Sequence, residues 1–184
     1  RVLKMLARLT FRHTVVTGLN TNELEPVSHA GAKALLNGDV KSPAQLFNHL
    51  RPIYVEKDRF VQAFTELEVS TRGQKKKLAK YILCTLERDA SSRPCDYQTD
   101  PGTIEHILPE NPGTEWDVAF PQDRQEKYLY RLGNLALLEA ATNREVGNGG
   151  YAMKVMAYSQ SKYDSTKSIA SLAPEEWTAD LLHE

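Results

Sequence analysis

The chain has few cysteines and no long apolar run, and each scarcity excludes a class of protein. Its two cysteines, Cys84 and Cys95, form no CxxC pair, so neither a zinc ribbon nor a disulfide framework is predicted. Reduced thiols in a cytoplasmic protein are therefore expected. The densest apolar patch, Leu135–Leu138, is far shorter than the roughly 18 to 20 residues of a membrane span, and the start shows no cleavable apolar segment. We therefore expect no membrane partner.

The chain also lacks an excess of charge of either sign. Its 23 Lys and Arg against 24 Asp and Glu give a net charge of −1, so any contact with nucleic acid must come from a local basic patch. The densest basic run is Arg72–Lys80, which is either a solvated helix face or a patch that contacts phosphates. The chain has no Walker A, GxSxG or GxGxxG motif, which argues against NTPase or serine-hydrolase chemistry.

Apolar spacing predicts a mainly helical region over residues 1–100. Ser42 followed by Pro43 indicates a helix start, because a capping side chain precedes proline in the first turn. The clearest helix is predicted over Gln74–Arg88, where apolar residues form one stripe. Because helical spacing begins with the first residues and no Met precedes them, we expect a domain of a longer protein with a partner domain upstream.

A second region is predicted over residues 101–184, after a turn-rich stretch at residues 90–102. It holds two extended stretches, Thr103–Leu108 and Leu132–Leu138, which we expect to pair as antiparallel strands. A helix is expected to begin near Asn143 and to pack on this hairpin. Further helices are expected over residues 151–162, 165–172 and 174–182. The predicted fold class is therefore α+β, mostly α-helical, with a small antiparallel β-hairpin plus helix packed with the helical first half.

Four polar side chains lie where these predicted elements meet: Glu105, His106, Asn134 and Asn143. Hydrolysis of a phosphodiester near neutral pH needs a base such as His, a divalent cation to hold the oxygens that become charged, and a group that orients the base. These residue types supply all three functions. One objection is geometric: neighbours in a regular strand point to opposite faces, so Glu105 and His106 serve one centre only at a strand end.

From about Thr103 to Trp177 the chain resembles the nuclease domain of GmrSD-like modification-dependent (type IV) restriction enzymes, a branch of the His-Asn-His (ββα-metal) superfamily. The stretch Arg8–Asn22 is similar, more weakly, to the helical region that precedes this domain. The elements that carry the resemblance are, in order, Ile104-Glu-His-Ile-Leu-Pro109, Trp116, Gly133-Asn-Leu135, Asn143, Asn148, Lys154 and Trp177.

The resemblance implies roles for three catalytic residues. His106 matches the general base, and Asn134 matches the middle residue of the His-Asn-His pattern, which braces the loop and orients the base. Lys154 matches a further family position and is expected to neutralise charge on the scissile phosphate.

The resemblance also implies a metal centre. Glu105 matches the acidic metal ligand, Asn143 the third position of the pattern, and Asn148 a further ligand position. Many superfamily members have Asp and His where this chain has Glu105 and Asn143, so the identity of the metal is open. The expected ion is Mg²⁺, with Mn²⁺ as the alternative.

The implied function is that of a metal-dependent DNA endonuclease, the cleavage domain of a prokaryotic restriction or phage-defence enzyme. Its expected partners are DNA, modified or of phage origin, and an upstream nucleotide-binding domain of the same protein. The alternative is a DNA-docking or protein-interaction module whose nuclease centre is weak or inactive, and nicking or RNase activity also stays open. Each residue alone has a structural explanation: His106 as a hydrogen-bonded histidine, Asn143 as a helix N-cap, and Trp116 and Trp177 as core or lid residues in preference to residues that stack on DNA.

Overall fold

The computed structural model describes residues 1–183 and divides the chain into two compact units. Unit 1 is Arg1–Phe64, and unit 2 begins at Thr65. The boundary lies after Phe64 and not near residue 100 because helix α5 (Lys75–Ser91) packs against the strands and against α9 of unit 2. No helix within residues 1–183 has both the length and the apolar character that crossing a bilayer requires.

Unit 1 is helical, as the apolar spacing predicts. Its elements are α1 (Val2–Thr10), the π-helix η1 (Phe11–Val16), the 3₁₀ turns η2 (Thr21–Glu23) and η3 (Arg51–Ile53), and the helices α2 (Leu24–Leu36), α3 (Pro43–Leu50) and α4 (Lys57–Thr65). The predicted start at Ser42 is confirmed, because its hydroxyl accepts a hydrogen bond from the Gln45 amide at 3.2 Å. The core joins α1, α2 and α3 through buried Leu9, Ala34 and Leu50.

Unit 2 contains the predicted hairpin. β1 (Thr103–His106) pairs antiparallel with β2 (Leu135–Leu138), and His106 lies opposite Leu135. The remaining elements of unit 2 are α5, η4 (Thr114–Trp116), α6 (Gln125–Leu129), η5 (Leu132–Asn134), α7 (Ala140–Val146), α8 (Tyr151–Ser159), α9 (Asp164–Leu172) and η6 (Asp180–His183). The predicted fold class, α+β and mostly helical, is confirmed.

Two predicted helix positions in unit 2 are wrong. The helix after β2 begins at Ala140, with Glu139 at the N-cap position, so Asn143 lies inside it and does not cap it. Residues 174–182 do not form a helix; only the short turn η6 (Asp180–His183) is helical there. The chain leaves α9 near Pro174 and then packs Trp177 into the core, and this packing replaces a further helix.

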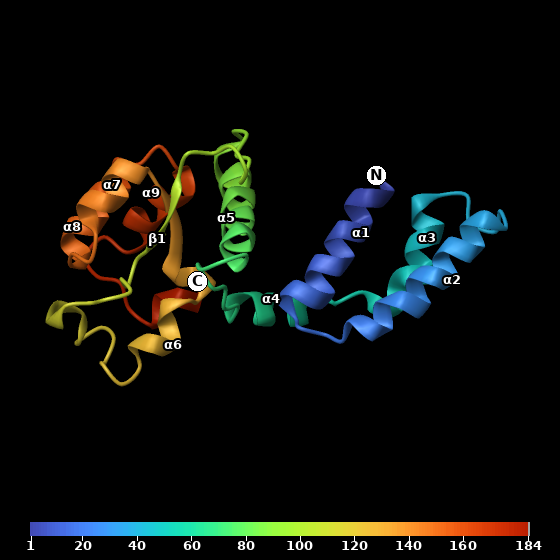
Figure 1. Cartoon of the computed structure of the whole chain (residues 1–184), viewed down its shortest axis with the longest axis horizontal. Helices are drawn as coiled ribbons and strands as arrows, with labels where there is room; N and C mark the ends of the chain where they lie inside the picture. Colours follow the sequence, from blue (N-terminus) through green and yellow to red (C-terminus); the bar gives the residue numbers. More distant parts are fainter. Residues whose placement is uncertain (184) are drawn as a thin grey trace. The chain divides into compact units, whose positions relative to one another are not determined.

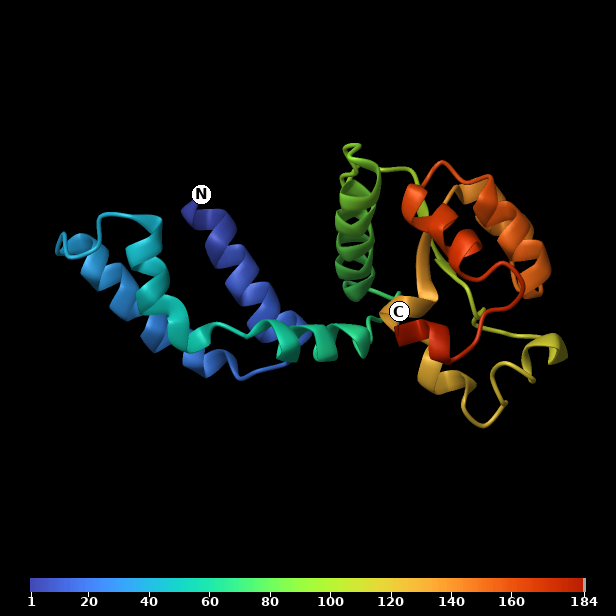
Figure 2. The same ribbon diagram turned by 180° about the vertical axis from the view of Figure 1, so that it is seen from behind.

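The two-stranded sheet lies between α5 and the helices α7 and α8 (Figure 1 and Figure 2). All four residues of β2 are buried, as expected for a strand covered on both faces. Trp116 and Trp177 are both buried and both lie against the ring of Tyr151, so their prediction as core residues is confirmed.

A second backbone pairing brings a distant segment to the end of β1. The Val69 amide donates to the Tyr130 carbonyl at 2.8 Å, and the Leu132 amide donates to the Leu67 carbonyl at 2.7 Å. An isolated bridge between Glu68 and Arg131 lies between these two bonds. The residues that follow Val69 therefore reach the part of unit 2 where β1 ends.

Candidate active site

His106 is the last residue of β1 and is held by its neighbours. Its Nε2 lies 3.2 Å from the hydroxyl of Thr71, and its ring meets the ring of Tyr130 edge-on at 5.9 Å. Burial lowers the pKa of His106 below its ordinary value of 6.5, although the nearby carboxylate of Glu110 acts in the opposite direction. A lowered pKa keeps the ring neutral near pH 7, which is the form that accepts a proton.

Asn134 fixes the backbone that follows His106. Its carboxamide accepts from the Leu108 amide at 2.7 Å and donates to the Leu108 carbonyl at 3.0 Å, while its own carbonyl accepts from the Ile107 amide at 3.0 Å. Asn134 is fully buried, so these bonds are shielded from water. The bracing of the loop that the resemblance implies for Asn134 corresponds to these contacts.

Gly133, next to Asn134, allows a close backbone approach. A Cβ at this position would lie 2.4 Å from the backbone carbonyl oxygen of Leu182, which belongs to η6. Because backbone atoms cannot move aside as a flexible side chain can, only glycine lets η6 pack at this point. The Gly133-Asn134 pair therefore joins three parts of unit 2: the strand end, η5 and η6.

Glu105 points away from His106, toward α8. Its Oε1 accepts from the ammonium of Lys154 at 2.6 Å and from the hydroxyl of Tyr158 at 2.8 Å, and all three side chains are buried. Lys154 also donates to the His106 carbonyl at 2.7 Å. Burial raises the pKa of Glu105 and lowers that of Lys154, and the contact between them opposes both shifts. At 2.6 Å in a buried setting, we regard the two as an ion pair.

The other two predicted metal ligands have different settings. The Asn143 amide nitrogen, on α7, donates to the Thr103 hydroxyl at 3.0 Å and to the Ile104 carbonyl at 3.1 Å. It therefore ties α7 to the start of β1. Asn148 is exposed in the turn after α7.

In this arrangement Glu105, Asn143 and Asn148 do not fit a metal centre beside His106. The carboxylate of Glu105 lies on the opposite side of β1 from the His106 ring, as the alternation of a strand requires. Its charge is already balanced by Lys154, and a divalent cation at the same oxygen would be repelled by the buried ammonium. Lys154 is itself fully buried, which also separates it from any scissile phosphate.

Four residues that the sequence did not single out individually surround the His106 ring. Thr71 contacts its Nε2, and Tyr130 donates from its hydroxyl to the Glu110 carboxylate at 2.9 Å. Arg72 donates to the same carboxylate oxygen at 3.1 Å and extends over the Tyr130 ring, with its side chain 73% exposed. Together they form a polar surface on the solvent side of the base.

The sequence held only partial signals for this surface. Arg72 opens the basic run Arg72–Lys80, and Glu110 follows the motif that contains His106 directly. Thr71 and Tyr130 carried no signal, because they reach His106 only through the backbone pairing of residues 67–69 with residues 130–132.

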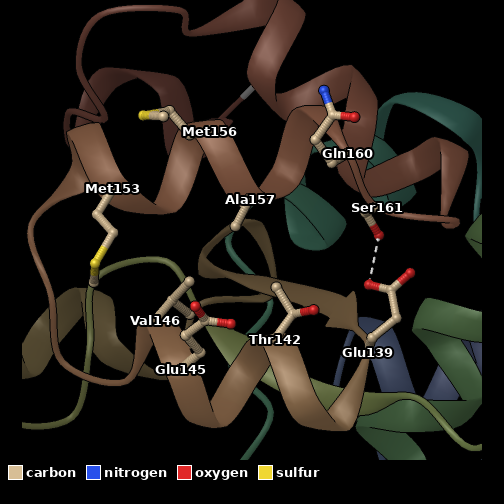
Figure 3. Close-up of a pocket in the computed structure, with 9 residues that line it drawn as sticks. All are labelled: Glu139, Thr142, Glu145, Val146, Met153, Met156, Ala157, Gln160 and Ser161. Carbon is tan, nitrogen blue, oxygen red and sulfur yellow. Dashed lines mark hydrogen bonds between the residues drawn. The ribbon is translucent and has the colours of Figure 1, made fainter.

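A separate pocket of about 530 Å³ lies between α7 and α8 (Figure 3). Its wall includes the carboxylates of Glu139 and Glu145 and the side chains of Met153 and Met156. Glu139 is held there by the Ser161 hydroxyl at 3.1 Å. The residues that line this pocket include these two carboxylates and no Lys or Arg, so it is unsuited to binding a nucleic-acid backbone, whereas the Glu110 carboxylate near His106 is paired with Arg72. The polar surface around His106 is the better candidate active site.

Comparison with known proteins gives one family. The profile described as "GmrSD restriction endonucleases, C-terminal domain" matches residues 54–184. The match includes every residue that the resemblance assigned a role, from Glu105 to Lys154. Neither the curated proteins nor the solved structures contain a match to this chain.

Proposed function

Because the chain belongs to the C-terminal domain family of the GmrSD restriction endonucleases, we propose that it is a DNA-cutting domain in which His106 is the general base. The observation that carries the proposal is the position of His106. It lies at a strand end, it is held in place by Thr71 and by the Asn134-braced backbone, and burial keeps it neutral. DNA is the proposed substrate because the family is one of restriction endonucleases.

In the proposed reaction the Thr71 hydroxyl, which can donate or accept, orients the His106 ring through its contact with Nε2. In the tautomer that we propose, the Nε2–H donates to this hydroxyl and the lone pair on Nδ1 accepts a proton from water. The oxygen of that water forms a bond to phosphorus, the bond from phosphorus to the leaving oxygen breaks, and solvent protonates the leaving oxygen. Thr71 acts as a positioning residue, and the exposed Arg72 guanidinium is placed to pair with phosphate oxygens.

The proposal includes a divalent cation, Mg²⁺ or Mn²⁺, because the resemblance to His-Asn-His nucleases implies one. No residue is assigned to hold it, since Glu105 is engaged with Lys154. Lys154 is proposed to neutralise Glu105 and to hold the His106 carbonyl, in place of the role at the scissile phosphate that the sequence suggested. We also propose that an upstream nucleotide-binding domain selects the DNA.

The test is a cleavage assay on supercoiled plasmid with Mg²⁺ or Mn²⁺, with and without EDTA. Nicked or linear product that EDTA abolishes is expected, together with loss of product in Thr71→Val, which removes the hydroxyl and keeps the shape of the side chain. The control is Thr85→Val, at an exposed position of α5. The Thr85 hydroxyl donates to the Tyr81 carbonyl and accepts from the Arg88 guanidinium, and both partners lie on the same helix. Full activity of a folded Thr71→Val variant would contradict the role of Thr71, and full activity in EDTA would contradict the cation requirement.

The buried Glu105–Lys154 pair favours a second candidate function. If the pairing of Glu105 with Lys154 keeps Glu105 from binding a metal ion, the chain is a DNA-docking or protein-interaction module whose nuclease centre is weak or inactive. The two candidates differ in one assay. Wild-type protein that binds duplex DNA and cuts neither plasmid DNA nor a matched RNA, with either ion, supports the docking module.

A further inference from the structure

Cys84 and Cys95 are eleven positions apart in the sequence but meet in unit 2, next to a carboxylate. The two sulfur atoms and one carboxylate oxygen of Asp100 all lie within 4.8 Å of one another. Cys84 is on the inner side of α5, and Cys95 is in the segment that folds back after it. Both thiols are free and buried. No sequence pattern predicted this cluster, because its ligand spacing matches no CxxC motif.

The backbone around the cluster is held in a defined shape. Ser92 takes a left-handed conformation (φ 56°) that ends α5 and turns the chain back. Asp96 then closes a turn whose carbonyl accepts from the Asp100 amide at 2.8 Å. Next to it, the Asp100 carbonyl accepts from the ammonium of Lys80 at 2.6 Å. These contacts fix the positions of Cys95 and Asp100 relative to α5.

The Asp100 side chain is oriented by two further bonds. Its Oδ1 accepts from the Tyr163 hydroxyl at 2.7 Å and from the Gly102 amide at 2.8 Å. A Cβ at Gly102 would lie 2.1 Å from the Tyr163 hydroxyl, so the absence of a side chain there makes room for this bond. In metal sites of proteins the ligands are typically oriented by hydrogen bonds of this kind from surrounding residues.

We propose that Cys84, Cys95 and Asp100 bind a zinc-type transition-metal ion. Two thiolates and a carboxylate match the ligand preferences of Zn²⁺, whose bonds of about 2.3 Å to sulfur place two tetrahedral sulfurs about 3.7 Å apart. That separation is compatible with the observed limit of 4.8 Å. The fourth position would be filled by water, since cavities of about 190 and 320 Å³ border Cys95.

Charge around the cluster is consistent with this ion. Two thiolates and one carboxylate carry three negative charges, so a divalent ion leaves one, which Lys80 and Lys162 partly balance. Burial raises the pKa of Cys84 and raises that of Cys95 to about 12. Because a metal ion binds cysteine as the thiolate, binding releases the protons of both thiols and is weakened at low pH.

A bound ion would clamp α5 to the segment that enters β1. Asp100 lies three residues before Thr103, where β1 starts, and β1 ends at His106. The clamp would stabilise unit 2 whether or not the chain cuts DNA, so it does not depend on the proposed function.

The test uses the full chain, reduced and freed of metal, and titrated with Co²⁺ as a spectroscopic substitute for Zn²⁺. We expect one equivalent to produce thiolate-to-cobalt absorption with visible bands of tetrahedral intensity. Zn²⁺ should displace Co²⁺ and remove these bands. Zn²⁺ at about 100 times its Kd should also raise the melting temperature by about 5 to 10 °C.

Three variants, each measured after circular dichroism shows a folded chain, identify the ligands. Each of the variants Cys84→Ser, Cys95→Ser and Asp100→Asn should weaken Co²⁺ binding at least tenfold. The control Asp89→Asn, which changes an exposed carboxylate on α5, should leave Co²⁺ binding unchanged. A folded, reduced wild-type chain that shows no thiolate-to-cobalt bands overturns the site. Bands that survive Asp100→Asn unchanged overturn the three-ligand assignment.

Discussion

Unit 1 and unit 2 bury different kinds of side chain. Among the described residues of unit 1, one polar side chain is buried, that of His13, and the core of this unit is aliphatic. The described part of unit 2 buries six polar or charged side chains: Glu87, Glu105, Asn134, Lys154, Ser161 and Thr166. The family profile follows the same division, because it covers all of unit 2 and only the last part of unit 1.

The difference follows the position of the candidate active site, which lies in unit 2. An aliphatic core tolerates repacking as long as its volume is kept. A buried polar group instead needs partners at fixed distances and angles, so each one fixes the local backbone. In unit 2 this happens around β1, where Asn134 holds Leu108 and Lys154 holds both Glu105 and the His106 carbonyl.

The largest difference between the units is expected in catalysis. His106→Ala should lower the cleavage rate about 10² to 10⁴-fold, because it removes the group that takes the proton from water. His29→Ala, an exposed histidine of α2 in unit 1, is the matched control and should leave the rate unchanged. Initial rates of plasmid nicking measure both. A folded His106→Ala variant that cuts at the wild-type rate would remove His106 from the mechanism.

The next largest effect concerns the buried ion pair of unit 2. Lys154→Met leaves the Glu105 carboxylate buried beside Tyr158 alone, which is expected to cost about 3 to 5 kcal/mol of unfolding free energy. Adding Glu105→Gln to this variant should recover part of that loss, because the amide carries no charge. Lys167→Met, in a half-exposed pair with Asp164, should cost at most about 1 kcal/mol.

Urea unfolding curves for the wild-type chain and these three variants give the free energies. Equal costs for Lys154→Met and Lys167→Met would show that the buried pair does not hold unit 2 together.

A smaller effect is expected in the pH profile. Burial lowers the pKa of His106, and the Glu110 carboxylate partly counteracts this by favouring the protonated ring. The base works only when neutral, so activity should fall as the pH drops through a pKa below 6.5. Glu110→Gln removes the nearby negative charge and should shift this acid limb to lower pH. Profiles of kcat/KM against pH test the direction, and a shift to higher pH would contradict the assigned contact.

Local patterns predicted the elements but not the contacts between distant residues. The apolar stripe of α5, the Ser42 cap and the two strands were predictable because each depends on residues close together in sequence. The position of Asn134 at the strand end also followed from the motif. The placing of Thr71 beside His106 could not be predicted, because it depends on a backbone pairing across more than 60 residues.

The partners of charged side chains were equally hidden from the sequence. Glu105 and Lys154 are 49 positions apart, and no rule of spacing indicates that they form an ion pair on the face of β1 opposite His106. The strand alternation did predict that Glu105 and His106 would point apart unless β1 bent. The structure follows this alternation, so Glu105 and His106 do not share one metal centre as the resemblance implied.

The smallest expected effect concerns which unit carries the charge that binds DNA. Lys75, Lys76 and Lys77 are exposed at the start of α5, a few residues from Thr71, whereas unit 1 has a basic groove of about 440 Å³ lined by Lys4, Arg8 and Arg12. Because the chain carries a net charge of −1, we expect weak, salt-sensitive binding without preference for a sequence or a modification.

Replacing the three lysines of α5 by Ala should lower the salt slope of DNA binding by about 0.9 for each DNA phosphate that is no longer neutralised. The double variant Lys4→Ala with Arg8→Ala should leave this slope unchanged. Fluorescence titrations of modified and unmodified duplexes across a series of salt concentrations measure these slopes. The reverse result would assign DNA docking to unit 1, and a clear preference for one modified duplex would assign recognition to this chain in place of an upstream domain.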